Sequence, residues 1–118
     1  MAEQAQPAWQ VEFYADSRGR CPALTFVQSL PKKEQAELLR VLELLQEFGL
    51  QLGMPHARPI AGLWELRAGP GRLFYVAHIG RRFIILHGYR KQSQAAPRRE
   101  IETAHRRWAD FLEQERQS

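Results

Sequence analysis

Several features that would define a class of protein are missing from this sequence. The single cysteine, Cys21, cannot form an intramolecular disulfide or a cysteine-based zinc site, which favours a reducing cytoplasm. No apolar run reaches the length of a signal-peptide core or a membrane span, so we expect neither secretion nor membrane insertion. No Pro/Gly/Ser-rich tract is present either, and we expect one domain over residues 1–118 with an ordered core at about 9–113.

The common catalytic signatures are also absent. There is no G-x-x-x-x-G-K-[ST] loop, no H-E-x-x-H, no G-x-S-x-G and no dinucleotide fingerprint, which excludes the enzymes that depend on them. The four histidines show no metal-ligand spacing, so we expect no metal and no cofactor. Any chemistry must come from ordinary polar side chains.

The sequence does have an uneven distribution of charge. Residues 1–57 hold five Lys or Arg against seven Asp or Glu, whereas residues 58–118 hold twelve against six. Fourteen of the seventeen cations are arginine, whose planar guanidinium binds phosphate and carboxylate groups through paired hydrogen bonds. The basic second half therefore indicates an anionic partner.

Hydrophobic periodicity predicts an α+β fold in the order β-α-α-β-β-β-α. Alternation over 9–15 indicates a strand, and apolar residues every three or four positions predict helices over 21–30 and 31–48, which form a helical hairpin. Branched and aromatic residues predict antiparallel strands over 63–68, 72–79 and 82–89, joined by short turns. A last helix begins at Pro97. We expect the hairpin to cover one face of an antiparallel sheet.

Polar side chains gather where the predicted middle strands end. Glu65 and Arg67 share a face of one strand, Arg72 begins the next, and the third ends at Lys91. For Glu65 and Arg67 the alternative is a cross-strand ion pair on a solvated face. RNA cleavage without metal needs a proton acceptor for the 2′-hydroxyl, a donor for the 5′-oxygen and cations on the phosphorane. The groups that could supply these are His87, Tyr89, Lys91 and the arginines, which we expect to lower the pKa of Tyr89 or Lys91.

Three short strings in fixed order resemble the phage-derived HigB-like branch of the RelE/ParE toxin superfamily. They are Leu63-Trp64-Glu65-Leu66-Arg67, Arg72-Leu73-Phe74-Tyr75 and His87-Gly88-Tyr89-Arg90-Lys91, followed by Pro97 and Glu100-Ile101. The resemblance extends over residues 9–113. It implies a small α+β fold and a type II toxin that cleaves messenger RNA in the ribosomal A site. It also implies a cognate antitoxin with a helix-turn-helix domain as the partner.

The resemblance assigns roles to individual residues. Arg67 and Arg72 match phosphate contacts, Arg90 and Lys91 match cations near the scissile group, and His87 matches a histidine often seen in the family. Tyr89 stands where the family commonly has Phe, so the catalytic role of its hydroxyl is inferred from this sequence. The remaining residues that we expect to bind RNA are Ser93, Arg98 and Arg99, with Arg106 and Arg107 as further candidates.

One segment departs from the family. After the His-Gly-aromatic string the family commonly continues Lys-Lys-Thr-x-Lys-Thr-Pro, whereas this chain has Lys91-Gln92-Ser93-Gln94-Ala95-Ala96-Pro97. The loss of two lysines predicts weaker binding of phosphate. Two alternatives therefore stay open. One is a ParE-like toxin that inhibits DNA gyrase by protein binding, and the other is a degenerate phage-derived module that binds RNA or an antitoxin without catalysis.

Overall fold

The computed structural model describes residues 9–95 and 97–118, and contains five strands and three α-helices in that range. Their order is β1 (Gln10–Phe13), α1 (Pro22–Ser29), α2 (Lys32–Phe48), a 3₁₀ turn η1 (Gly49–Gln51), β2 (Ala57–Ile60), β3 (Leu63–Ala68), β4 (Gly71–His78), β5 (Arg82–Arg90) and α3 (Arg98–Gln117). No helix among the described residues is long and apolar enough to cross a membrane.

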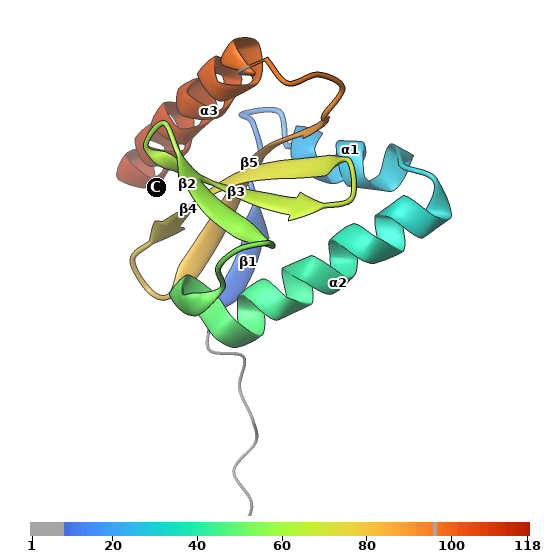
Figure 1. Ribbon diagram of the computed structural model, residues 1–118. Helices are drawn as coiled ribbons and strands as arrows, with labels where there is room; N and C mark the ends of the chain where they lie inside the picture. Colours follow the sequence, from blue (N-terminus) through green and yellow to red (C-terminus); the bar gives the residue numbers. More distant parts are fainter. Residues whose placement is uncertain (1–8, 96) are drawn as a thin grey trace, which may run out of the picture.

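The five strands form one sheet in the order β1-β5-β4-β3-β2, which lies between two helical layers. Helices α1 and α2 cover one face, while α3 covers the other (Figure 1). Leu66, Leu73 and Phe83 of the sheet pack beneath α1 and α2, whereas Phe74 and Ile84 point to α3. The alternation of side chains along each strand therefore divides the hydrophobic residues between two clusters.

The predicted elements are present, and the α+β class is confirmed. Two features of the sheet differ from the expectation. Strand β1 pairs with β5 in parallel, because these strands are far apart in the chain and no tight turn sets their direction. Strand β2 was not predicted, since it has four residues and includes Pro59. A proline has no N–H to donate, and β2 accommodates it because it lies at the edge of the sheet.

A β-bulge in β5 determines which side chains face α3. Phe74 of β4 pairs with His87, but the next residue, Tyr75, pairs with Ile85, so Leu86 is the extra residue in β5. Because neighbouring strand residues point to opposite faces, this insertion turns His87 and Tyr89 to the α3 side. Without the bulge, both side chains would point toward α1 and α2.

Candidate functional site

Polar side chains form a row across four neighbouring strands on the α3 face, at the end of the sheet next to the β3–β4 turn. Arg58 of β2 pairs with Glu65 of β3, Arg67 of β3 pairs with Arg72 of β4, and Arg72 pairs with Tyr89 of β5. We call these five residues the arginine row. The arginine row thus contains three guanidinium groups and one carboxylate, which leaves an excess of positive charge.

Glu65 is the buried centre of the arginine row. Its side chain is 1% exposed, and its carboxylate accepts hydrogen bonds from Arg58 Nε at 3.0 Å and from the Tyr89 hydroxyl at 3.1 Å. Arg67 Nε lies 4.0 Å from the same carboxylate. A buried carboxylate is tolerated only when it is paired and hydrogen-bonded. The alternative interpretation of Glu65 as part of a solvated ion pair is therefore wrong.

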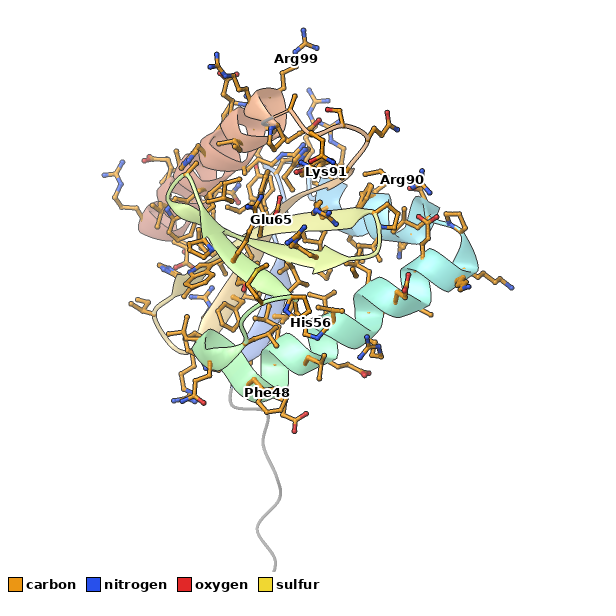
Figure 2. The ribbon with its side chains drawn as sticks, viewed as in Figure 1. Phe48, His56, Glu65, Arg90, Lys91 and Arg99 are labelled. Atoms are coloured by element: carbon orange, nitrogen blue, oxygen red, sulfur yellow. The ribbon has the colours of Figure 1, made fainter. Side chains whose placement is uncertain are left out.

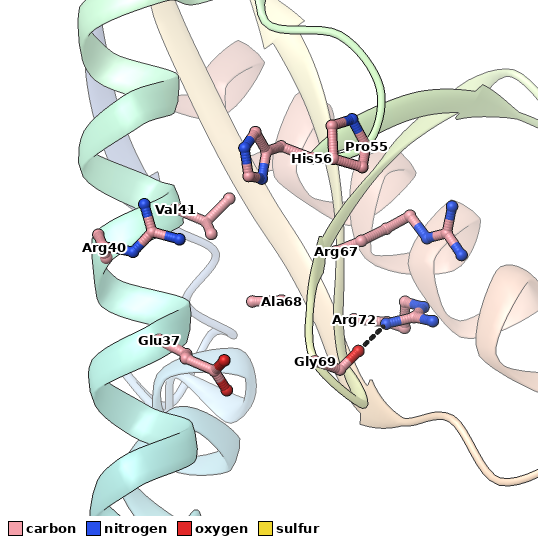
Figure 3. A pocket seen from close by; sticks show the side chains of 9 residues that line it. All are labelled: Glu37, Arg40, Val41, Pro55, His56, Arg67, Ala68, Gly69 and Arg72. Carbon is pink, nitrogen blue, oxygen red and sulfur yellow. Dashed lines mark hydrogen bonds between the residues drawn. The ribbon is translucent and has the colours of Figure 1, made fainter.

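Arg72 is held by the turn beside it and lacks an acidic partner of its own. Its Nη1 donates to the carbonyl oxygen of Gly69 at 2.7 Å (Figure 3) and to that of Gly71 at 3.0 Å. Its buried Nε has no hydrogen-bond partner among the described residues. Burial, followed by the charge of Arg67, lowers the pKa of Arg72 from its ordinary value. Two like charges thus face each other across β3 and β4, an arrangement that an anion would relieve.

Tyr89 keeps its proton in this setting. Burial, and then the neighbouring charge of Glu65, raises the pKa of Tyr89, although Arg72 acts in the opposite direction. Its hydroxyl donates to Glu65 Oε2, and its ring packs against Phe74 with the centroids 5.5 Å apart. The expectation that the arginines lower the pKa of Tyr89 is wrong, because burial and the carboxylate outweigh them.

His87 is fixed by two residues of α3. Arg107 Nη1 lies 2.9 Å from His87 Nδ1, and His87 Nε2 lies 2.6 Å from Glu100 Oε1. Because a guanidinium only donates, Nδ1 must accept, and the ring proton is therefore on Nε2 and is donated to Glu100. Burial lowers the pKa of His87, which agrees with a neutral ring. With both nitrogens engaged, His87 is placed to support Tyr89, whose ring stacks on it at 6.2 Å, and not to accept a proton.

The end of β5 brings the predicted strand-end residues beside Tyr89. Lys91 donates its backbone N–H to Pro70 of the β3–β4 turn at 2.8 Å, which places it next to the turn that holds Arg72. Arg90 is bound by Glu34 of α2 through hydrogen bonds of 2.7 and 3.1 Å, so its charge is already compensated. A hollow of about 190 Å³ is lined by Tyr89, Arg90, Lys91, Gln92, Ser93, Ala95, Pro97 and Glu100.

The remaining predicted RNA contacts lie outside the arginine row. Arg98 and Arg99 are exposed in the first turn of α3, and Figure 2 shows Arg99 directed away from the sheet. Arg107 is half-buried and donates to the Leu86 carbonyl as well as to His87, so it is engaged in the fold. The structure thus brings together Arg67, Arg72, Tyr89 and Lys91, with His87 behind them.

Two parts of the site were not found from the sequence. Arg58 was missed because β2 was not predicted, although the Arg58–Glu65 register follows directly once β2 is paired with β3. The contacts of Glu100 and Arg107 with His87 depend on how α3 crosses the sheet, for which the sequence pattern carries no signal. No group of three or more potential metal ligands occurs among residues 9–95 and 97–118.

The fold agrees with that of a known structure. A chain in the RelBE2 toxin–antitoxin complex from Mycobacterium tuberculosis matches with a TM-score of 0.51 and 24% identity, over 70% of this chain and 98% of that chain. Residues 25–109 match the family described as phage-derived protein Gp49-like (DUF891), so the chain belongs to this family. No curated protein matches the sequence. The predicted membership of a phage-derived family is thereby confirmed, and the fold is the one that the resemblance to RelE/ParE toxins implies.

Proposed function

We propose that this chain is a cytoplasmic toxin of a type II toxin–antitoxin pair, which cleaves messenger RNA in the ribosomal A site and is neutralised by a cognate helix-turn-helix antitoxin. Cleavage proceeds without metal, with the 2′-hydroxyl of the substrate as the nucleophile. We take residues 1–118 as one domain. The family and the fold support a toxin of this superfamily, and the arginine row supports an RNA substrate.

The observation that carries the proposal is the pairing of Arg67 with Arg72. Two arginines opposite each other on neighbouring strands cost stability, and the buried Nε of Arg72 has no partner among the described residues. An RNA phosphate between them would satisfy both features, because a phosphodiester carries a negative charge and offers several acceptor oxygens. Lys91 lies beside the same turn and adds a third cation at the phosphorane.

The other residues take supporting roles. We assign Tyr89 to proton exchange with the 2′-hydroxyl or the 5′-oxygen of the substrate, because it lines the hollow and its ring stacks on His87. Arg90, Ser93, Arg98 and Arg99 surround the hollow or begin α3, and we assign them to the RNA backbone on either side of the cleaved bond. An acidic antitoxin segment would compensate the arginine row in the inactive complex.

Induction of the chain in cells tests the proposal, beside the Arg72→Ala/Lys91→Ala double variant, with message ends mapped by sequencing. We expect growth arrest and cuts phased with the reading frame, both of which the double variant loses. Exposed Arg116→Ala is the matched control, because Arg116 pairs with Glu113 in the last turns of α3 and lies outside the arginine row.

The other outcomes identify the alternatives. Growth arrest with intact messages would contradict the ribonuclease and favour a protein target such as DNA gyrase. Absence of arrest in a folded, well-expressed protein would favour a module that binds RNA or antitoxin without catalysis.

A further inference from the structure

Glu65 is a buried carboxylate that accepts a hydrogen bond from the hydroxyl of Tyr89, a residue that lines the substrate hollow. Tyr89 lines the hollow beside Lys91, and its O–H points back into the sheet, where it donates to Glu65 Oε2 at 3.1 Å. The lone pairs of the phenolic oxygen are therefore free to accept a proton from a group in the hollow. Glu65 itself, at 1% exposure, reaches the substrate only through Tyr89.

We propose that Glu65 is the final acceptor of the proton that leaves the RNA 2′-hydroxyl, and that Tyr89 passes this proton on. This inference rests on the proposed ribonuclease function. As the 2′-oxygen bonds to phosphorus, its proton moves to the Tyr89 oxygen while the phenolic proton of Tyr89 moves to Glu65 Oε2. The bond from phosphorus to the 5′-oxygen breaks, its electron pair stays on that oxygen, and the Lys91 ammonium protonates it. The products are a 2′,3′-cyclic phosphate and a 5′-hydroxyl. Glu65 then returns its proton through Tyr89, and Lys91 regains one from water.

Transfer of both protons together explains how Tyr89 works without becoming a phenolate. Its surroundings raise its pKa, so a free phenolate is disfavoured at neutral pH. Moving one proton in as the other leaves keeps Tyr89 neutral throughout. His87 is not placed to accept this proton, because both of its ring nitrogens are engaged by Arg107 and Glu100.

Arg58 is the positioning residue of this relay. Its Nε holds Glu65 Oε1 at 3.0 Å, which leaves Oε2 directed at Tyr89. It also compensates the carboxylate charge between turnovers, because an uncompensated charge at this depth would be costly. The edge position of β2 places Arg58 beside Glu65 without placing it in the hollow.

The relay is tested by single-turnover cleavage of a defined message on programmed ribosomes, with the purified full chain in excess. We compare wild type with Glu65→Gln, Tyr89→Phe and the double variant. Glu12→Gln is the matched control, because Glu12 is a strand carboxylate bound to an arginine, Arg82, away from the hollow. Glutamine keeps the shape of glutamate and still accepts a hydrogen bond from Tyr89, but cannot take up the proton.

We expect each single variant to reduce the maximal cleavage rate by about 10²–10⁴-fold, while the toxin concentration at half-maximal rate stays within about threefold. The double variant should be no slower than either single variant, because both changes interrupt one path. Glu12→Gln should cleave as wild type does.

Several outcomes would overturn the relay. These are a Glu65→Gln variant with nearly wild-type rate, or a double variant whose loss is the product of the two single losses. If the Glu65 variant does not fold, the cleavage rate of wild type is measured in mixtures of H₂O and D₂O. Transfer of two protons in one step makes the rate depend on the deuterium fraction along a curve. A straight line overturns the proposal. A wild-type chain that leaves ribosomal messages intact refutes the ribonuclease itself, and this is seen before any variant is made.

Discussion

Gly88 lies between His87 and Tyr89 in β5, the strand that carries the site. A single methyl group at this position should lower the stability of the folded protein. A Cβ at this position would lie 2.4 Å from Phe26 Cδ2 of α1 and 2.8 Å from Leu73 Cδ2 of β4. Both distances are far below van der Waals contact, and Leu73 is fully buried. Gly88→Ala must therefore displace α1 from the sheet or force Phe26 from its position.

Overpacking of this kind costs about 1–3 kcal/mol. For a chain of this size, each kcal/mol shifts the melting temperature by roughly 3–6 °C. We therefore expect Gly88→Ala to melt about 3–18 °C below wild type when unfolding is followed by circular dichroism. Gly53→Ala is the matched control, because no atom lies within 4 Å of a Cβ at Gly53. If Gly88→Ala melts within about 1 °C of this control, the close packing of α1 on β5 is not as described here.

Three further predictions concern the site. Arg67→Gln removes the like-charge pair with Arg72, so the melting temperature of this variant should equal or exceed that of wild type. Its rate of message cleavage should fall about 10²-fold. A large loss of stability would contradict the repulsion between the two arginines. Burial lowers the pKa of His87, so the folded state disfavours its protonation, and urea titrations should show wild-type stability falling as pH drops below about 6.5. The stability of His87→Gln should depend less on pH. Equal pH dependence in the two proteins would contradict a neutral ring in the folded state. Gln92→Lys and Ala95→Lys restore the family's lysines, and each should steepen the salt dependence of RNA binding by about 0.7 in log–log slope, whereas unchanged slopes would show that this loop does not touch the backbone.

Local patterns were sufficient to predict most of the elements. Alternation and short turns define β3, β4 and β5 because both signals are local in sequence, and apolar spacing defines α2 for the same reason. The pairing of β1 with β5 is a contact between distant segments, and no residue in either strand specifies its direction. Strand β2 has too few residues, and a proline among them, to show a period.

The residues of the site could be predicted from the sequence, but their burial and protonation states could not. Period-two alternation places Glu65 and Arg67 on one face, which the sequence shows directly. Whether Glu65 is solvated depends on side chains from other strands, and Arg58 of β2 and Tyr89 of β5 contact its buried carboxylate. Burial also reverses the expected direction of the pKa of Tyr89, and the contacts with α3 remove His87 from proton transfer. Protonation follows from the tertiary environment, which composition and spacing do not encode.

The bulge in β5 connects the fold to the proposed function. One extra residue, Leu86, turns His87 and Tyr89 toward α3, whereas regular pairing would bury Tyr89 under α1 and leave Glu65 without its hydroxyl donor. The residue after His87 must then face α1, and Gly88 fits there because Phe26 and Leu73 leave no room for a side chain. The glycine of the His-Gly-aromatic string is thus required by the packing of α1, and the aromatic residue after it by the site. A single local irregularity therefore sets both the stability of the α1 layer and the position of the proton relay.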